Sequence, residues 1–391
     1  MRVHQLFTVL GIIALTGITS CTSFPSSRNP AMDKTGWITH CFGRFLIDLP
    51  PQAEVRAGYY LRGQVIEPLK DDLAGLISRI DQHEQELKRQ QHDTKGSMFV
   101  RRYDLGRGST GILSWASDAS IESYYLYAYA VSEPVWQPYY WRIEMEPDRE
   151  PRGIEVAKNL VRDLRSREPN EIPSEPGFCM DRGYIAGSHF QSERFDIGVT
   201  FPDHPGAHFE FTSSTGAEED RLLDRVGGFL AGAARAVTGI ETLRKRERSG
   251  PVPADEYLLA GTDKGQRIYT FAWEAQGKDG SITEPNISAA LGVLERSPDS
   301  SGKLPAPPFK SDREALELWD TVIDSVRLRP VSSALRGSNA GSPSPAAPAG
   351  STKVMDDDYA IAVKEGCLPL SIAFRGMKSL IAGKPKGEAG S

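Results

Sequence analysis

HCFGRFLIDLP, at positions 40–50, opens a pattern of elements that the chain runs through twice. A related opening, GFCMDRGYI, stands at positions 177–185, and Cys41 and Cys179 occupy matching places in the two openings. Extended sequence follows each of them, at 55–66 and at 194–211. The second extended stretch alternates apolar with polar or small residues, which is the period of a strand whose two faces have different surroundings; the apolar positions are Phe195, Ile197, Val199 and Phe201.

An amphipathic helix is expected next in each pass, at 69–91 and at 218–237. In the first helix the apolar residues near one face are Leu73, Leu76, Ile77, Ile80 and Leu87. Four strand-like runs and a closing helix follow in each pass. The expected strands are 98–103, 111–116, 121–131 and 141–145 in the first pass and 242–246, 256–261, 266–275 and 287–294 in the second, and the closing helices are 153–165 and 311–326.

This order of elements predicts an α+β fold, because strands joined by hairpin-length connections form antiparallel sheets that helices cover. We expect two similar lobes, an N-terminal lobe at 37–168 and a C-terminal lobe at 174–330, each a mainly antiparallel sheet packed with helices. Two unrelated α+β domains are the alternative.

The N-terminus has the form of a lipoprotein signal peptide. Residues 6–18 are almost wholly apolar, a run too short to span a bilayer but of the length of a signal-peptide core. The run Ile-Thr-Ser-Cys that ends at Cys21 resembles the bacterial lipobox. We therefore expect residues 1–20 to be removed, Cys21 to carry the lipid, and residues 21–36 to form a flexible tether. Because Thr22 is not aspartate, the resemblance implies a periplasmic protein held at the outer membrane. An ordinary signal peptide with a chance cysteine is the alternative.

Three cysteines remain if Cys21 is lipidated, and exported proteins fold where disulfides form. Cys41 and Cys179 each stand just before an expected first strand, so we predict that they pair and tie the two openings together. Pairing of either with Cys367 remains open.

Residues 331–391 lie outside both lobes. A low-complexity linker rich in Ser, Pro, Ala and Gly occupies 331–352, and the tail after it holds one apolar patch at 367–374. No role follows for this tail. The net charge of −6 is mild, so nothing favours nucleic acid, which calls for a basic face.

No catalytic signature stands out, since the G-x-S-x-G, G-x-x-x-x-G-K-[ST] and H-E-x-x-H motifs are all absent from the sequence. His204 and His208 have a spacing that would suit a metal on a helix, but the Pro-Gly pair between them makes a turn. We expect a solvated hairpin there, with no metal and no cofactor. The basic run at 244–248 is expected to be a solvated strand edge rather than a site for an acidic partner.

Aromatic side chains are concentrated in one region of the first pass. Tyr125, Tyr127 and Tyr129 share one face of an expected strand, where they either cover a helix or face a partner. The loop expected at 133–141 adds Trp136 and Tyr139, and aromatic residues fixed by neighbouring prolines make good interface anchors. Trp136 and Tyr139 are therefore the candidate partner-binding residues.

The opening at 41–50, Cys-x-Gly-Arg-aromatic-x-x-Asp-Leu-Pro, resembles the start of the immunity proteins for type VI secretion lipase effectors of the fourth class. The opening at 177–179 resembles the start of that family's C-terminal domain. The similarity covers roughly residues 37–330 and gives no support to the tail. It implies a periplasmic, non-enzymatic protein with two α+β lobes that clamps a phospholipase of the α/β-hydrolase class and blocks access to its active site. No catalytic residue carries over.

The residues themselves agree with a binder, because an exported and tethered chain without catalytic motifs most easily acts by binding. An envelope-assembly or ligand-binding lipoprotein is the main rival, and a periplasmic hydrolase with an unfamiliar site is a more distant one.

Overall fold

The computed structural model describes residues 32–188, 192–226, 240–263, 265–294 and 296–331. The expected signal peptide, the lipidation site Cys21, most of the tether and the tail from residue 332 lie outside this part of the chain. Among the described residues, no helix has the length and apolarity needed to cross a membrane.

The fold is α+β and is dominated by one antiparallel sheet of twelve strands with few helices. Its N-terminal half contains β3 (Glu54–Leu61), β4 (Gln64–Pro68), β5 (Phe99–Gly106), β6 (Ser109–Trp115), β7 (Tyr124–Ser132) and β8 (Gln137–Met145). Its C-terminal half contains β12 (Glu193–Thr200), β13 (Ala207–Ser214), β14 (Ile240–Arg248), β15 (Ala254–Asp263), β16 (Gln266–Ala275) and β17 (Asn286–Val293).

Strand order is the same in the two halves. Outward from the middle of the sheet, the N-terminal half reads β3-β4-β8-β7-β6-β5 and the C-terminal half reads β12-β13-β17-β16-β15-β14. Each half is therefore a hairpin followed by four strands that return from the outer edge to meet it. An internal repeat requires this shared order, but that the lobes superpose stays a prediction.

The two halves form a single sheet, which the sequence analysis did not foresee. Strands β3 and β12 pair antiparallel along their whole length, from Glu54 opposite Thr200 to Leu61 opposite Glu193. Each is the first strand of its half and would otherwise leave a row of unpaired backbone N–H and C=O groups. Their pairing removes both edges at once.

Two short sheets lie against the core side of the large one. In the first, the hairpin of β1 (Ile38–Phe42) and β2 (Phe45–Leu49) pairs with β18 (Arg327–Leu328). In the second, the hairpin of β10 (Gly177–Met180) and β11 (Gly183–Ala186) pairs with β9 (Leu164–Ser166). The opening hairpin of each pass thus pairs with the last strand of the other pass.

This exchange of hairpins is supported by side-chain contacts. The Phe45 ring lies 6.5 Å from that of Phe211 in the C-terminal half, and the Asp48 N–H donates to Ser325 Oγ over 2.9 Å. In return, the Tyr139 hydroxyl of the N-terminal half donates to the Asp181 carbonyl over 2.8 Å. Neither stretch of contiguous sequence, 37–168 or 174–330, contains the hairpin that completes its own core.

We therefore expect residues 32–168 and 171–331, expressed as separate chains, to lack a cooperative thermal transition. Each would expose the apolar surface that the other's hairpin covers. Circular dichroism melts of the two fragments, alone and mixed, against the full chain would test this. A cooperative melt of either fragment alone would contradict the interlocked arrangement.

The helices start and end near the predicted positions. Those that lie wholly in the described residues are α1 (Leu73–Arg89), α2 (Glu150–Asp163) after the short 3₁₀ turn η1 (Pro147–Arg149), and α4 (Asp312–Ile323). Asp72 and Ser311 cap α1 and α4 by accepting from backbone N–H groups of the first turn, as N-cap residues do. Of the helix expected at 218–237, only residues up to 226 lie in the described part, where Leu222 and Val226 pack against Tyr257 and Leu259.

One helix face was wrongly predicted. Leu76, Ile80 and Leu87 are buried in α1 as expected, but Leu73 and Ile77 are 56% and 49% exposed. These two residues lie at the side of the helix face that meets the sheet. Their apolar side chains suggested burial, but this side of the helix is open to solvent.

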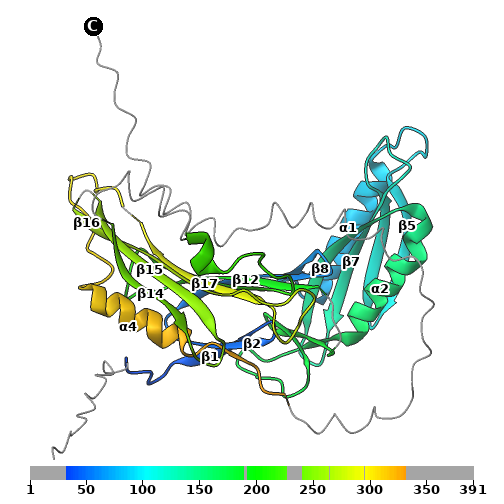
Figure 1. Cartoon of the computed structure of the whole chain (residues 1–391). Coiled ribbons are helices and arrows are strands. Elements are labelled where there is room, and N and C mark those ends of the chain that lie inside the picture. Colours follow the sequence, from blue (N-terminus) through cyan, green and yellow to red (C-terminus); the bar gives the residue numbers. More distant parts are fainter. Residues whose placement is uncertain (1–31, 189–191, 227–239, 264, 295, 332–391) are drawn as a thin grey trace, which may run out of the picture.

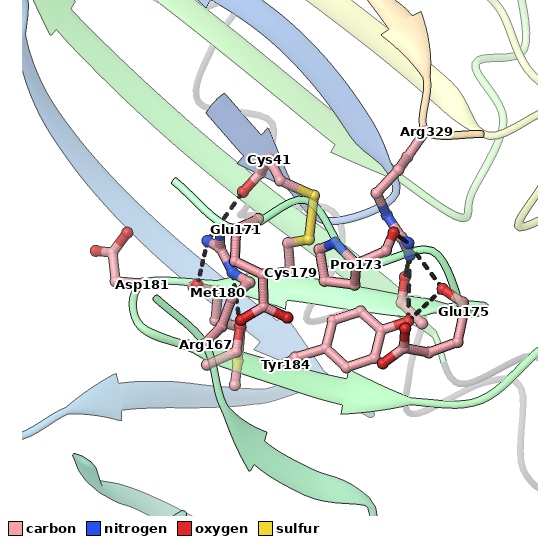
Figure 2. Close-up of a disulfide and its surroundings, with 12 residues drawn as sticks. Cys41, Arg167, Glu171, Pro173, Glu175, Cys179, Met180, Asp181, Tyr184 and Arg329 are labelled. Atoms are coloured by element: carbon pink, nitrogen blue, oxygen red, sulfur yellow. Dashed lines mark hydrogen bonds between the residues drawn. A yellow bond between two sulfur atoms is a disulfide. The ribbon is translucent and has the colours of Figure 1, made fainter. Parts of the chain in front are cut away.

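The predicted Cys41–Cys179 disulfide is present, and Figure 2 shows it between the two exchanged hairpins. The cysteines lie inside β1 and β10, not before a strand, and are 2% and 0% exposed. Beside them, Gly43 and Cys179 exchange two backbone hydrogen bonds of 2.9 and 2.8 Å. Cys41 and Gly43 belong to the β1–β2 hairpin and Cys179 to the β10–β11 hairpin. The disulfide and this pair of hydrogen bonds therefore join the two small sheets.

Two buried arginines hold the same region together (Figure 2). Arg167 donates to the carbonyls of Met180, at 2.9 Å, and Cys41, at 3.5 Å, which belong to different hairpins. Arg329, after β18, donates to the Gly177 carbonyl over 2.7 Å and to that of Pro173. Carbonyls that a short sheet leaves unpaired are thereby satisfied.

Candidate partner-binding face

The central strands have one apolar and one polar face, because their residues alternate. On β12, Phe195, Ile197 and Val199 are at most 2% exposed and belong to the core, whereas Arg194 and Asp196, which alternate with them, are half-buried. The register extends the polar face across neighbouring strands: Tyr60 lies opposite Arg194 and Val65, and Gly58 lies opposite Asp196. We call this side of the twelve-stranded sheet the open face.

Two helical segments lie on the open face and bracket its middle. In the N-terminal half, His83 of α1 contacts Tyr127 (ring centroids 4.4 Å apart) and its Nδ1 lies 2.8 Å from the Tyr129 hydroxyl. In the C-terminal half, the buried Leu222 and Val226 pack on the same side of the sheet. Figure 1 shows α4, β1 and β2 below the sheet, α1 above it, and both ends of the sheet rising on either side of the middle.

Charged and aromatic groups meet at the centre of the open face, where the two halves join. The Arg194 guanidinium lies 3.0 Å from Asp196 and 5.1 Å from the Tyr60 ring centroid. Burial raises the pKa of the Asp196 carboxyl, while Arg194 acts in the opposite direction. Burial, with help from the Asp196 charge, also raises the pKa of Tyr60. On β13, His208 Nε2 lies 3.4 Å from Glu210 Oε1.

The predicted tyrosine face of β7 is part of the open face. Tyr129 is buried under α1, whereas Tyr125 and Tyr127 stay half-buried. Arg142 of β8 stacks on the Tyr125 ring at 4.1 Å. The prediction that these tyrosines cover a helix is therefore correct for Tyr129 and Tyr127, which both contact His83 of α1, while the half-buried Tyr125 adds accessible aromatic surface. Tyrosine and arginine are enriched in protein interfaces, since they bury large areas and also hydrogen-bond.

The two residues predicted as loop anchors have different positions. Tyr139 is 0% exposed and lies in β8, so its assignment to the loop and to a partner interface is wrong. Its ring fills the core beside the β10–β11 hairpin, which is why no partner can reach it. Trp136 does lie in the loop, 37% exposed, and donates from Nε1 to the Asp71 carbonyl over 3.2 Å. Its role in binding stays a prediction.

The histidines and the basic run have structural contacts. His204 and His208 lie at the β12–β13 hairpin, and His204 Nδ1 is 2.9 Å from the Pro308 carbonyl.

The basic run lies in β14, which is an edge strand as predicted. The prediction that the run is solvated is wrong for Arg248, which is only 6% exposed. Arg248 pairs with Asp320 (2.8 Å), Asp324 (2.6 Å) and the fully buried Glu256. Arg248, together with Arg244, which also pairs with Asp320 over 2.6 Å, fastens β14 to α4.

A pocket of about 390 Å³ lies in the C-terminal half beside Arg221, Asp255 and Glu274. Burial raises the pKa of Glu274 to about 7, and Arg225 donates to both of its oxygens, at 2.6 and 2.7 Å. Arg221 likewise pairs with Asp255. The charges that line this pocket are therefore paired within the protein.

Within the described ranges, no three His, Cys, Asp or Glu side chains are grouped so as to hold a metal ion. Sequence reasoning missed Tyr60, Arg194, Asp196 and Glu210 as a group. The alternation around Arg194 and Asp196 was visible, but their meeting with Tyr60 depends on the β3–β12 pairing, for which the sequence carries no local signal.

A wide polar face with aromatic and arginine side chains, bracketed by helices, defines a protein that acts by binding another macromolecule. Family models agree: residues 38–133 match the N-terminal domain, and residues 171–331 the C-terminal domain, of Tle cognate immunity protein 4. The chain belongs to this family of type VI secretion immunity proteins, which are inhibitors and not enzymes. Comparison with curated proteins gives no match.

Solved structures of relatives cover most of the chain. The apo immunity protein TplEi of the type VI secretion system of Pseudomonas aeruginosa is 56% identical, with a TM-score of 0.74, over 77% of this chain and 100% of that one. A protein in the Tle4–Tli4 complex is 57% identical, with a TM-score of 0.74 and the same coverage. TplEi bound to an "L" peptide is 54% identical, with a TM-score of 0.69, over 76% of this chain and 100% of that one.

Proposed function

We propose that this protein neutralises a secreted phospholipase of the Tle4 kind by seating it against the open face, with the two halves of the sheet gripping it from either side. The observation that carries the proposal is the open face itself, where Tyr60, Arg194 and Asp196 stand at the junction of the halves. The solved Tle4–Tli4 complex, whose matched chain is 57% identical to this one, supports the choice of partner.

Steric exclusion is the mechanism that this geometry favours. A lipase needs its active-site entrance free to take up lipid, so a rigid body that covers the entrance stops it without chemistry. Two halves that contact one partner could bury roughly 2,000 Å² or more, which is the range of permanent complexes. Burial of that size is compatible with a nanomolar constant, or about −12 kcal/mol.

We further propose that the two lobes are copies of one fold, since their strand orders agree, and should superpose strand for strand.

A lipid on Cys21 would hold the inhibitor in the periplasm at the outer membrane, close to the lipids that the enzyme attacks, and so raise its local concentration there. Mass spectrometry of the membrane fraction should find a triacylated N-terminal Cys21; an unmodified N-terminus elsewhere would exclude the anchor.

The purified protein is expected to abolish phospholipase activity at one equivalent. Titration into a fixed enzyme concentration, well above the dissociation constant, should give a straight fall in lipid hydrolysis that reaches zero at a ratio of one. An unrelated lipase is the control. Full activity at several equivalents, together with unimpaired survival of a deletion strain challenged by its type VI-competent sibling, would overturn the proposed function.

A further inference from the structure

The disulfide has an unusual position, because it joins two hairpins that have changed places. Cys41 belongs to the hairpin that pairs with β18 at the C-terminal end, and Cys179 to the hairpin that pairs with β9 of the N-terminal pass. Each hairpin also packs on the far half of the large sheet. The link between them therefore crosses the junction of the halves on the side opposite the open face.

The disulfide is the covalent link among several contacts between the hairpins. The others include the two Gly43–Cys179 backbone hydrogen bonds, the Arg167 and Arg329 side chains, and the packing of Leu46 with Tyr184 around the two cysteines. Backbone hydrogen bonds each contribute little net stability, so the covalent bond is the strongest restraint on the distance between the hairpins. The β3–β12 pairing already joins the two halves at the middle of the sheet, and the link between the hairpins behind it adds a second restraint on how the two arms stand relative to each other.

Both sulfur atoms lie inside the protein, where Cys41 is 2% and Cys179 is 0% exposed. Thiol–disulfide exchange requires direct attack of a thiolate on a sulfur atom, so access decides its rate. An oxidant can reach these cysteines only before the hairpins close, and a reductant is shut out afterwards.

We infer that the Cys41–Cys179 bond is a one-way latch, which forms during folding in an oxidising compartment and sets the two halves at the spacing the partner requires. The part of the inference that concerns the partner rests on the proposed function. The part that concerns the latch rests only on the exchange of the hairpins. In the closing step, both thiols lose their protons and one S–S bond forms. The two electrons pass to a disulfide oxidant, which leaves as a dithiol.

The chain would then become a tight binder only where disulfides form. Before oxidation the same sequence would carry two buried thiols, and the hairpins would be held by noncovalent contacts only, chiefly the Gly43–Cys179 backbone bonds, the buried arginines and the packing of Leu46 with Tyr184. The arms could then vary in spacing, and a partner gripped by both halves would lose part of its contact. The chain could thus fold without this covalent bond, but would need it to inhibit the partner fully.

The test compares the exported full chain with its Cys41→Ser/Cys179→Ser variant, with Cys367→Ser as the matched control for loss of a cysteine. Amide exchange in β1 and β10 is expected to be about tenfold or more faster in the double variant, since local opening is no longer held by the bond. Phospholipase affinity should weaken about tenfold or more, mainly through faster dissociation. Unchanged exchange in these strands would overturn the latch whether or not the phospholipase binds.

If the double variant does not fold, the wild-type protein still decides the matter. Refolding from denaturant with dithiothreitol present should give a weaker binder than refolding with oxidised glutathione. Native oxidised protein should resist dithiothreitol until denaturant is added, as followed by thiol alkylation; rapid reduction of the native protein would refute the one-way character. Failure of the oxidised wild type to inhibit, with slow exchange retained in β1 and β10, would reject the proposed function and leave the latch standing.

Discussion

Replacing Gly58 with tryptophan should strongly weaken binding of the phospholipase while the fold survives. Gly58 lies on the open face at the centre of β3, opposite Asp196 of the other half, and is half-buried. A Cβ at this position would meet the Tyr60 ring and hydroxyl at 3.6 Å and the Asp196 carbonyl at 3.9 Å, which are ordinary contacts. The backbone there needs no glycine, so a bulky residue can stand up from the sheet.

The expected loss is large because the new side chain occupies the place where the partner would sit. A partner seated on both halves must cross the β3–β12 junction, and an indole there would hold the two surfaces apart. We expect affinity to fall about 100-fold or more, or about 2.7 kcal/mol, so that at enzyme concentrations near the wild-type dissociation constant one equivalent of the variant no longer inhibits. Aromatic residues suit strands, so the melting temperature should not drop.

Gly250→Trp is the matched control. Gly250 lies in the loop between β14 and β15, and a Cβ built on it has no described atom within 4 Å. Tryptophan there adds the same apolar bulk at an outer edge of the sheet, so inhibition should be unchanged. Equal inhibition by Gly58→Trp and by the wild type would show that the partner does not use the open face.

Glu193→Ala should be among the most destabilising single substitutions in the protein. Glu193, the first residue of β12, is 5% exposed and accepts two hydrogen bonds from Arg44, at 2.7 and 2.6 Å. Arg44 lies in the turn of the exchanged β1–β2 hairpin, with its side chain 12% exposed, and its one other hydrogen-bond acceptor among the described residues is the Gly187 carbonyl, at 3.2 Å. Removing the carboxylate would leave a buried, uncompensated guanidinium, which costs about 3–5 kcal/mol.

Urea denaturation under oxidising conditions would measure this change. The double variant Arg44→Met/Glu193→Leu should recover most of the stability, because a buried ion pair is often replaceable by apolar residues of similar volume. Glu284→Ala, which breaks the exposed pair with Lys278, is the control and should cost less than about 1 kcal/mol. A Glu193→Ala variant as stable as this control would mean that Arg44 reaches solvent.

Local patterns in the sequence predicted much of the fold. The alternation at Phe195, Ile197 and Val199 reports burial on one side of β12, which depends only on neighbouring residues. The two cysteines stand in matching openings, and their pairing followed from that. What could not be predicted involves partners far apart in the chain: the β3–β12 pairing joins Leu61 to Glu193, and β18 joins Arg327 to Leu46. A local pattern of apolar and polar residues does not specify which distant strand will pair with the edge of a given strand.

The errors at the candidate site have the same origin. Tyr139 follows prolines and was placed in a loop, whereas the β7–β8 pairing draws it into a strand and the exchanged hairpin buries it. Arg248 looked like a solvated cation because the acids that pair with it, Asp320 and Asp324, lie in and after a helix that follows much later in the sequence. The central group at Tyr60 and Arg194 exists only once the two halves share a sheet.

The small sheet of β1, β2 and β18 brings the beginning and the end of the folded part together, since β1 starts at Ile38 and β18 ends at Leu328. It lies beneath the large sheet, on the side away from α1 (Figure 1). Segments that precede β1 or follow β18 are therefore joined to the side of the molecule opposite the open face. A lipid at Cys21 would thus be joined to the side of the molecule opposite the open face, so that attachment to a membrane would leave the open face free for an incoming enzyme.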